Sequence, residues 1–483
     1  MQIRRFGAVL ALAAMLSGCG GGGAGDTMAS TPTGGGGNAL PSQPVAAGCS
    51  LRERQNWAAA QLKEWYLFPE TLPTSLDPSP YADVGSYVDA LTATARGQGK
   101  DRFFTYLTSI AEENAYYDSG SSAGFGIRLG VDSTQSRLFV IEAFEGAPAL
   151  AAGIDRGAEI LAIGTSASDL KTVSSIVAAG GTAALTTALG PDTTGTSRVL
   201  RISDAAGTRN VTLAKTDFSL APVSSRYGAQ VITDGGQQYG YVNLRTFIST
   251  ADPALRAAFA RFKAAGITNV IVDFRYNGGG LISIAQLMGD LMGANRSTSE
   301  VFDYMTFRPE KSAENETRTF QPQAESIAPT RVAFIGTAGT ASASELVIAA
   351  AIPYLHANAA LIGTNTYGKP VGQIALDKAS CDDRLRVIAF SLQNANRQGA
   401  YYTGLANTVE ASCQAADDIG YPLGDPREAS TRSALDFLEG KSCTRITAST
   451  DATTASLRSG AGRRDLLMPM AASTAQREVP GLF

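Results

Sequence analysis

The sequence predicts a multi-domain α/β protein, and three observations lead to this prediction. The chain has 483 residues, which exceeds one ordinary domain of about 150 residues. Short apolar stretches separated by turns fill residues 119–215, whereas apolar strands alternate with amphipathic helices from about residue 238. Such alternation is typical of a layered α/β domain with functional residues beyond the carboxyl ends of its strands.

Periodicity places the elements of this α/β region one by one. The expected strands are 239–244, 269–274, 331–335 and 359–363, and the expected helices are 253–265, 284–292 and 342–351. The hydrophobic content of 44% suits a chain with a sizeable core, and the net charge of -4 without a basic stripe excludes nucleic acid as an expected partner.

The first 19 residues have the pattern of a lipoprotein signal peptide. Two arginines precede an apolar run at 6–16, which is too short to span a membrane. The Leu-Ser-Gly-Cys sequence that ends at Cys19 resembles the bacterial lipobox. This resemblance implies lipidation of Cys19 and anchoring in the bacterial cell envelope, facing the periplasm. Gly20, rather than Asp, favours the outer membrane. An ordinary signal peptide that contains a cysteine is the alternative.

Two further segments precede the β-rich region. Residues 20–48 are mostly Gly, Ser, Thr, Pro and Ala, which predicts a disordered tether. Residues 49–118 are predicted to form a helical N-terminal domain, since aromatic and aliphatic side chains recur there with helical spacing. Within this domain, 87–91 and 103–110 are expected to be helices.

The four cysteines after Cys19 are an even number in a predicted oxidising compartment, which allows two disulfides. They are Cys49, Cys381, Cys413 and Cys443, and three pairings remain open. No Cys-x-x-Cys motif or Cys/His cluster indicates a zinc site, so no metal is expected.

Residues 119–215 resemble a PDZ domain. The resemblance rests on Gly-Ala-Pro-Ala at 146–149, followed by Ala-Gly-Ile at 152–154. It implies that Gly124, Phe125, Gly126 and Ile127 form the loop that holds a peptide C-terminus. Backbone N–H groups of such a loop can receive a carboxylate, and the adjoining strand edge can pair with the peptide. Taken alone, these four residues also fit a plain strand start.

Two familiar catalytic arrangements are excluded. His356 is the sole histidine of the chain and lies at a predicted helix exit, so a Ser-His-Asp triad is not expected. Residues 363–369 match the spacing of a phosphate-binding loop up to its lysine. However, Pro370 replaces the required Ser or Thr and lacks an N–H group.

Three segments remain as candidates for chemistry. Ser342 precedes a predicted helix, whose N-terminus favours developing negative charge; simple helix capping, with Glu345 completing a capping box, is the alternative. Lys369 would serve as a base only if burial lowered its pKa from about 10.4. The glycines that follow the strand ending at Phe274, including Gly278 and Gly279, could direct N–H groups into a cleft.

Together these segments resemble the C-terminal processing peptidases, also called tail-specific proteases. The motifs are Asp-x-Arg-x-Asn-x-Gly-Gly from Asp273, Thr-Ala-Ser-Ala-Ser-Glu from Thr340 and Tyr-Gly-Lys-x-x-x-Gln from Tyr367, in the order of that family. The resemblance covers roughly residues 50–440. It implies a core similar to the crotonase and Clp-protease superfamily, into which the PDZ-like domain is inserted.

The resemblance also implies residue roles. Ser342 would be the nucleophile, Lys369 its base and Gln373 the side chain that orients the lysine. The oxyanion would be held by the N–H of Ala343 and by that of Gly278 or Gly279. No cofactor is required. An S41-type catalytic domain would occupy residues 216–443, and the Ser-, Thr-, Ala- and Arg-rich residues 444–483 are expected to be mostly disordered.

The implied function is a serine endopeptidase of the cell envelope that cleaves proteins or peptides near an accessible C-terminal tail. One alternative is a non-catalytic PDZ-containing lipoprotein that captures peptides. Another is a structural envelope protein with a PDZ anchor. The sequence leaves the oligomeric state, the substrate and the preferred terminal residues open.

Overall fold

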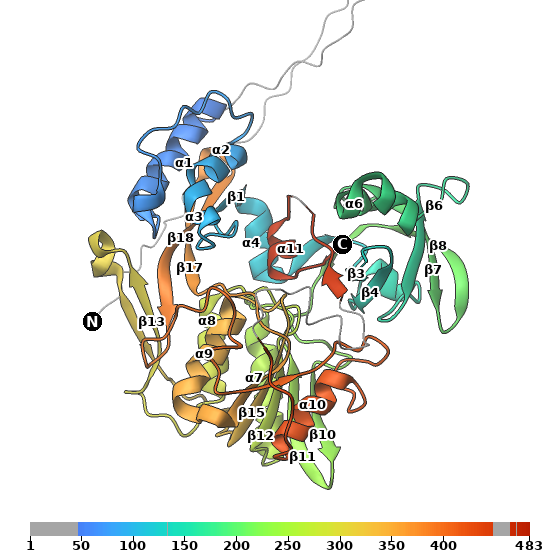
Figure 1. Cartoon of the computed structure of the whole chain (residues 1–483), viewed down its shortest axis with the longest axis vertical. Helices are drawn as coiled ribbons and strands as arrows, with labels where there is room; N and C mark the ends of the chain where they lie inside the picture. The colour runs from blue at the N-terminus through green and yellow to red at the C-terminus, as the bar shows by residue number, and fades with distance from the viewer. Residues whose placement is uncertain (1–46, 133, 448–463, 470) are drawn as a thin grey trace, which may run out of the picture. The chain divides into compact units, whose positions relative to one another are not determined.

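The computed structural model of this chain describes residues 47–132, 134–447, 464–469 and 471–483, and Figure 1 shows how their helices and strands are arranged. The predicted signal peptide, the lipidation site at Cys19 and almost all of the predicted tether lie outside the described residues. Within the described ranges, no helix has both the length and the apolar character that crossing a membrane requires.

A six-stranded sheet forms the centre of the α/β region. In spatial order its strands are β10 (Ala229–Asp234), β11 (Gln237–Asn243), β12 (Asn269–Asp273), β15 (Arg331–Gly336), β16 (Ala359–Gly363) and β19 (Ala411–Gln414). β10 and β11 are antiparallel, and the other neighbouring pairs are parallel. The carboxyl ends of β12, β15 and β16 therefore meet at one edge of the sheet.

Helices cover both faces of this sheet, as Figure 1 shows. α7 (Ala251–Ala264), α8 (Ile282–Leu291) and α9 (Ala343–Leu355) pack on one face, and α10 (Ala429–Leu438) packs on the other. Successive side chains of a strand point to opposite faces. Accordingly, Val270 and Val272 join the core under α7–α9, whereas Ile271 joins the core under α10. Both faces are apolar, which accounts for the continuous apolar strands in the sequence.

A second sheet supports the N-terminal helices. It contains β1 (Tyr106–Ser109), β18 (Asp383–Gln393), β13 (Val301–Phe307) and β14 (Glu316–Thr319), with β17 (Val371–Lys378) also paired to β18. α1 (Leu51–Trp65), α2 (Val84–Leu91) and α3 (Ala93–Gly97) precede β1, and α4 (Ile110–Ser119) follows it. Leu62 and Val88 pack with Val387 in one apolar cluster.

The helix expected at 103–110 is not formed. Residues 106–109 are instead strand β1, which pairs antiparallel with residues 383–386 of β18. The partner strand lies almost 280 residues further along the chain, at positions such as Arg386 opposite Tyr106. Tertiary pairing has therefore overridden the local helical spacing on which the expectation rested.

The β-rich region contains its own sheet. The order is β20 (Arg464–Leu466), β3 (Ile127–Asp132), β4 (Leu138–Ala143), β5 (Glu159–Gly164), β7 (Ser197–Asp204) and β8 (Gly207–Ala214), with β6 (Lys171–Thr172) paired to β5. The short helix α5 (Pro148–Ala151) and α6 (Val173–Leu189) pack against it. Strands β2 (Ser121–Gly124) and β9 (Thr216–Ser219) form a separate pair, so residues 216–219 close this region rather than open the next one.

The expectation of disorder after residue 443 is wrong for much of that segment. Residues 464–466 form strand β20, and residues 474–478 form helix α11 (Thr474–Glu478). α11 lies against α4, near the β-rich sheet in Figure 1. β20 extends the edge of β3. Order therefore comes from a partner elsewhere in the fold, which the polar composition of the segment does not reveal.

Two disulfides resolve the pairing that the sequence left open. Cys49 is bonded to Cys381, which ties the start of α1 to the turn between β17 and β18. Cys413 in β19 is bonded to Cys443, which follows α10.

Candidate active site

The predicted catalytic segments meet at the carboxyl edge of the central sheet. Ser342 follows β15, the glycine-rich turn follows β12, and the loop with Lys369 follows β16. Because β12, β15 and β16 are adjacent and parallel, their outgoing loops lie side by side. This edge is the usual position of a site in an α/β sheet.

Ser342 has an unusual backbone conformation. It is the N-cap of α9, with φ of 55° and ψ of -115°. A positive φ costs a non-glycine residue energy on the order of 1–3 kcal/mol, which the surrounding structure must offset. The residue is half-buried and stands at the start of the helix. Such strain is common at functional sites.

Glu345 links the serine to the lysine loop. Its carboxylate is fully buried and accepts the backbone N–H of Ser342 at 3.1 Å. The same carboxylate accepts the N–H groups of Gly368 and Lys369, each at 2.7 Å, and the hydroxyl of Thr366 at 2.6 Å. Burial raises the pKa of Glu345, and these four hydrogen bonds oppose the rise. One side chain therefore fixes the position of the lysine loop relative to the helix of Ser342.

Lys369 has the surroundings that a neutral amine requires. The residue is 9% exposed, and its Nζ donates to Gln373 Oε1 at 2.9 Å. Gln373 in turn donates to the carbonyl of Phe104, whose ring lies 5.1 Å from Nζ. Burial lowers the pKa of Lys369, and the negative charge of Glu478 opposes that shift. The amine and the Ser342 hydroxyl, both of which the structure describes, share no hydrogen bond.

The N-terminal region completes the lysine pocket. Phe104 lies between α3 and β1, in the segment 103–110 that was expected to be a helix, and its ring contacts the amine. Next to it, the guanidinium of Arg102 donates to the carbonyls of Tyr367 and Gly368 at 2.6 Å each. Through these contacts the N-terminal region packs against the lysine loop and helps to hold it in place.

The glycine turn presents two N–H groups that differ in their partners. Gly279 N–H donates to Asn277 Oδ1 at 2.9 Å, whereas Gly278 N–H donates to the backbone carbonyl of Glu478 at 2.9 Å. Asn277 also accepts the N–H of Ala341 at 3.0 Å, which joins the turn to the serine segment. Between the two predicted donors, Gly278 has its N–H directed away from its own turn.

Gly279 is required for close approach to the serine. A Cβ atom at this position would lie 2.8 Å from Ser342 Cβ and 3.2 Å from Ser342 Oγ, and the residue has φ of +123°. A side chain here would therefore be both strained and in collision with Ser342. Ala343, the third predicted donor, is the first residue of α9, where N–H groups lack intrahelical acceptors.

A buried charge cluster anchors the motif that begins at Asp273. The guanidinium of Arg275 contacts the carboxylates of Asp273 at 2.8 Å and of Glu428 at 2.9 Å, and all three side chains are buried. Tyr241 donates to Asp273 at 2.7 Å. These contacts hold the carboxyl end of β12, from which the glycine turn leaves.

The predicted peptide loop has an occupant from the same chain. Ile127 N–H donates to the Phe483 carbonyl at 3.1 Å, and Phe483 N–H donates to the Ile127 carbonyl at 2.9 Å. A Cβ atom at Gly124 would lie 2.8 Å from the carbonyl carbon of Phe483. Phe125 and Gly126 complete the loop, with Phe125 fully buried and Gly126 at φ of +71°.

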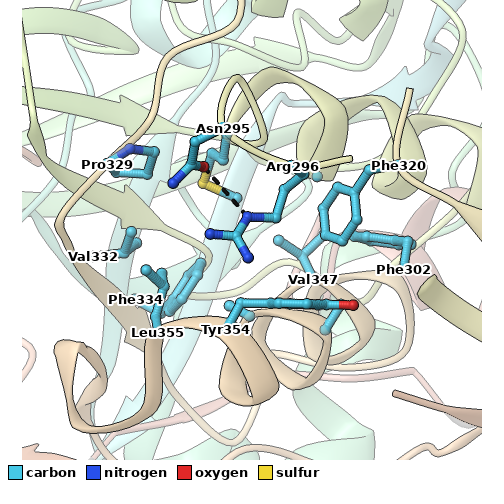
Figure 2. A pocket seen from close by; sticks show the side chains of 14 residues that line it. Asn295, Arg296, Phe302, Phe320, Pro329, Val332, Phe334, Val347, Tyr354 and Leu355 are labelled. Atoms are coloured by element: carbon cyan, nitrogen blue, oxygen red, sulfur yellow. Dashed lines mark hydrogen bonds between the residues drawn. The ribbon is translucent and has the colours of Figure 1, made fainter. Parts of the chain in front are cut away.

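Two other features lie apart from these residues. His356 caps the end of α9 and contacts Glu410 at 2.9 Å on the surface. A small apolar cavity lies beyond α9, where Figure 2 shows the rings of Phe302, Phe320 and Tyr354 beside Arg296. None of the predicted site residues lines this cavity.

The sequence predicts only a capping role for Glu345 and no role for Phe104 or Glu478. Glu345 stands within the Thr-Ala-Ser-Ala-Ser-Glu motif, so its motif position was the available signal. Phe104 and Glu478 reach the site through tertiary contacts from distant segments, and no local pattern marks them.

Comparisons with known proteins show which proteins the chain is similar to. Residues 238–407 match the model of peptidase family S41. The chain is 27% identical over 251 residues to a carboxyl-terminal-processing protease of Synechocystis sp., covering 52% of this chain and 54% of the relative. It is 25% identical over 354 residues to carboxyl-terminal-processing peptidase 3, chloroplastic, of Arabidopsis thaliana, covering 71% of this chain and 63% of the relative. The chain thus spans between half and two thirds of these relatives.

A solved structure shows the same fold. It is a crystal structure from Bacteroides fragilis assigned to the S41 proteases, and it superposes with a TM-score of 0.60 at 21% identity. The match covers 80% of this chain and 97% of the other.

Proposed function

We propose that this chain, whose residues 238–407 match the model of peptidase family S41, is a serine endopeptidase in which Lys369 activates Ser342. The observation that carries the proposal is the state of Lys369. Its amine is buried, it is oriented by Gln373, and its loop is tied by Glu345 to the helix that Ser342 begins.

The chemistry follows from a neutral amine. Burial penalises the charged form of Lys369, so the neutral form is present nearer to neutral pH than for a solvated lysine. Nζ then takes the proton of Ser342, and Oγ attacks the carbonyl carbon of a peptide bond. The resulting ammonium gives its proton to the leaving amine. Water next attacks the acyl-enzyme and restores the serine.

The reactive state requires the lysine side chain to turn, and it requires Gly278 N–H to be free of the Glu478 carbonyl that it binds. The amine donates to Gln373 at 2.9 Å and shares no hydrogen bond with the Ser342 hydroxyl. Four rotatable bonds of the lysine side chain allow Nζ to turn towards Oγ while its backbone stays fixed by Glu345. The tetrahedral oxyanion would be held by Gly278 N–H and Ala343 N–H. Gly278 supports this role because its N–H already binds a carbonyl oxygen.

The proposed substrate is a polypeptide with an accessible C-terminal tail, cleaved near that end. We infer that residues 119–215 act as a PDZ-like domain with Gly124–Ile127 as its peptide loop. The observation in support is the antiparallel pairing of Ile127 with Phe483, which is strand addition of the kind that PDZ domains use.

The proposed location is the periplasmic side of a bacterial envelope, through a lipid on Cys19 and with the outer membrane favoured. The lipobox-like sequence supports the anchor. The two disulfides support an oxidising compartment.

A second candidate function is peptide capture without catalysis. The lack of a hydrogen bond between the Lys369 amine and the Ser342 hydroxyl favours it, because a binding protein needs no such bond. The two functions differ in whether the hydroxyl is required for peptide-bond cleavage.

The test uses residues 46–483, which form one compact unit. These residues are incubated with an unfolded polypeptide that has an apolar C-terminus, and products are mapped by mass spectrometry. Ser342→Ala is expected to lower kcat by at least about 1,000-fold. Ser299→Ala, which changes an exposed serine, is the matched control and should retain parental activity. Equal cleavage by Ser342→Ala and the parent would refute the proposal.

A further inference from the structure

The C-terminal segment pairs with the whole length of one strand edge. Residues 464–466 pair with 130–132 of β3, and residues 481–483 bind 127–129 of the same strand. In the second group, Leu129 N–H donates to the Gly481 carbonyl at 2.8 Å. The edge on which a PDZ-like domain would receive a peptide is therefore already occupied by the chain itself.

The occupant is held by side chains as well as by backbone. Phe483 is 3% exposed and belongs to the apolar cluster of Ile127, Leu129 and Leu185, and Leu482 is 2% exposed. Burying an aromatic side chain removes a large apolar area from water, which stabilises the contact. Gly481 permits close approach, since a Cβ atom there would lie 2.9 Å from the Leu129 carbonyl oxygen.

The same segment covers the candidate oxyanion donor. The carbonyl of Glu478 accepts the Gly278 N–H at 2.9 Å. A Cβ atom at Gly278 would lie 2.3 Å from the Arg477 carbonyl oxygen. The backbone of residues 477–478 therefore packs so closely against the glycine turn that no side chain fits between them. The Glu478 carboxylate is buried and accepts the Tyr117 hydroxyl at 3.1 Å. Its negative charge favours the ammonium form of Lys369 and so raises the pKa of that lysine.

The backbone of this occupant is unlike that of a substrate. Residues 474–478 form helix α11, which Ser473 and Gln476 close with a reciprocal capping box. Val479 N–H donates back to the Ala475 carbonyl at 2.8 Å. A scissile bond must be approached by an extended chain on both sides. A carbonyl presented from a helix occupies the donor without that geometry.

Other contacts fix the helix in place. Arg477 donates to the Phe103 carbonyl at 3.3 Å, and its guanidinium lies 3.9 Å from the Tyr106 ring. Gln476 Nε2 donates to Asp192 at 2.7 Å and to the Leu482 carbonyl at 3.0 Å. The tail thus contacts the N-terminal region, the β-rich region and the glycine turn of the site.

From these contacts we propose that residues 474–483 are an inhibitory ligand that the chain supplies to itself. Residues 481–483 fill the groove beside β3, and Glu478 covers Gly278. An apolar C-terminal tail of another polypeptide would compete with Phe483 for the groove, and its entry would release Glu478 from the site. This inference rests on the proposed function in that the covered site is the proposed catalytic one.

The strength of the effect follows from tethering. A ligand attached to its own receptor has an effective concentration on the order of millimolar. A free peptide at micromolar concentration therefore competes poorly with the intact tail. Weakening the tail should improve peptide binding and, if the site is catalytic, turnover.

The experiment weakens the tail in residues 46–483 and reads binding separately from cleavage. Phe483→Asp puts a charge into the apolar cluster, and Leu51→Asp adds the same charge at an exposed position. A labelled peptide with the sequence Val-Pro-Gly-Leu-Phe is titrated by fluorescence anisotropy in the Ser342→Ala background. Cleavage of an unfolded polypeptide is measured with Ser342 present.

We expect Phe483→Asp to bind the peptide at least about tenfold more tightly than the parent and to raise turnover by a similar factor. Gly481→Ala should do the same by collision with the Leu129 carbonyl. Gly207→Ala is its control, because Gly207 has φ of +98° and no atom within 4 Å of an added Cβ.

The outcomes separate the two proposals. Equal peptide affinity in the parent, Phe483→Asp and Gly481→Ala would overturn the inhibitory tail. Tighter binding without cleavage by any variant would support the tail and refute the proposed catalysis. Loss of residues 479–483 from the parent, but not from Ser342→Ala, would make the tail a substrate and would also overturn the inference.

Discussion

The buried carboxylate of Glu345 accepts the backbone N–H of Lys369 at 2.7 Å. Through its hydrogen bond with Ser342 N–H at 3.1 Å, the same carboxylate holds two loops that leave neighbouring strands. The lysine therefore has a fixed backbone and a movable amine. Because only the backbone is fixed, the amine can donate to Gln373 in the described state and turn to the Ser342 hydroxyl in the proposed reaction.

Replacing Glu345 with Gln should test this role. A glutamine side chain can accept through one atom only, so two of the four donors that face Glu345 would lose their acceptor. Each lost partner costs about 1–3 kcal/mol. Displacement of the lysine loop by about 1 Å should lower kcat about 100-fold, with little change in KM.

The kinetics of Glu345→Gln are best measured in the Phe483→Asp background, in which the tail is expected to leave the site. Glu410→Gln is the control, because Glu410 is exposed and pairs with His356. A variant with unchanged kcat would show that the serine and lysine loops are held by other contacts.

The basicity of Lys369 should set the pH dependence of turnover. Rate should rise with pH as the ammonium loses its proton, and burial should place this limb below the ordinary lysine pKa of about 10.4. Gln373→Glu would put a negative charge at the hydrogen-bonding position of the amine. Because opposite charge favours the ammonium, the pKa of Lys369 should rise and the limb should move to higher pH by about 1–3 units.

The measurement is the pH profile of kcat for the parent and for Gln373→Glu. Gln237→Glu adds the same charge at an exposed position in β11 and should leave the profile unmoved. A shift to lower pH in Gln373→Glu would contradict the assignment of Lys369 as the base.

The two glycines of the turn should behave differently when they are changed to alanine. A Cβ atom at Gly279 would collide with Ser342, so Gly279→Ala should lower kcat and destabilise the fold by about 1–3 kcal/mol. A Cβ atom at Gly278 would collide with the Arg477 carbonyl, so Gly278→Ala should expel the tail. Titration with the Val-Pro-Gly-Leu-Phe peptide should show tighter binding for Gly278→Ala alone. Equal affinities in both variants would contradict the placement of the tail on Gly278.

Much of the catalytic region could be predicted from the sequence because its elements are strongly periodic. The expected strand 359–363 has the observed bounds of β16, and the expected helix 342–351 begins within one residue of α9 but continues to Leu355. The motif positions of Ser342 and Lys369 fall on loops after adjacent strands. Sequence could place these residues at one edge, since parallel strands end together.

The parts that could not be predicted depend on contacts between distant segments. Local spacing favoured a helix over Phe103–Ile110, yet pairing with β18 made residues 106–109 a strand. The tail has a polar composition typical of disorder, yet its last residues find the open edge of β3. Phe104 and Glu478 contact the site for the same reason. No local sequence pattern indicates that the tail pairs with β3 or that Lys369 is buried.

Asp303 offers a prediction about stability that is independent of catalysis. Its side chain is fully buried in β13, and burial raises its pKa to about 6, while a hydrogen bond from Gln286 opposes the rise. The unfolded chain should titrate this group near the ordinary pKa of about 3.9. Between these values the folded state holds a proton that the unfolded state has lost, so the free energy of unfolding should fall as pH rises from about 4 to 6.

Asp303→Asn should remove this dependence, because the amide carries no charge at any pH in the range. The variant should equal the parent near pH 4 and exceed it above pH 6 by up to about 3 kcal/mol, the equivalent of a shift of about two pKa units. Urea unfolding at pH 4, 6 and 8 measures the difference, and Asp118→Asn, at an exposed position, is the control. A difference that stays constant with pH would mean that Asp303 keeps its charge in the fold.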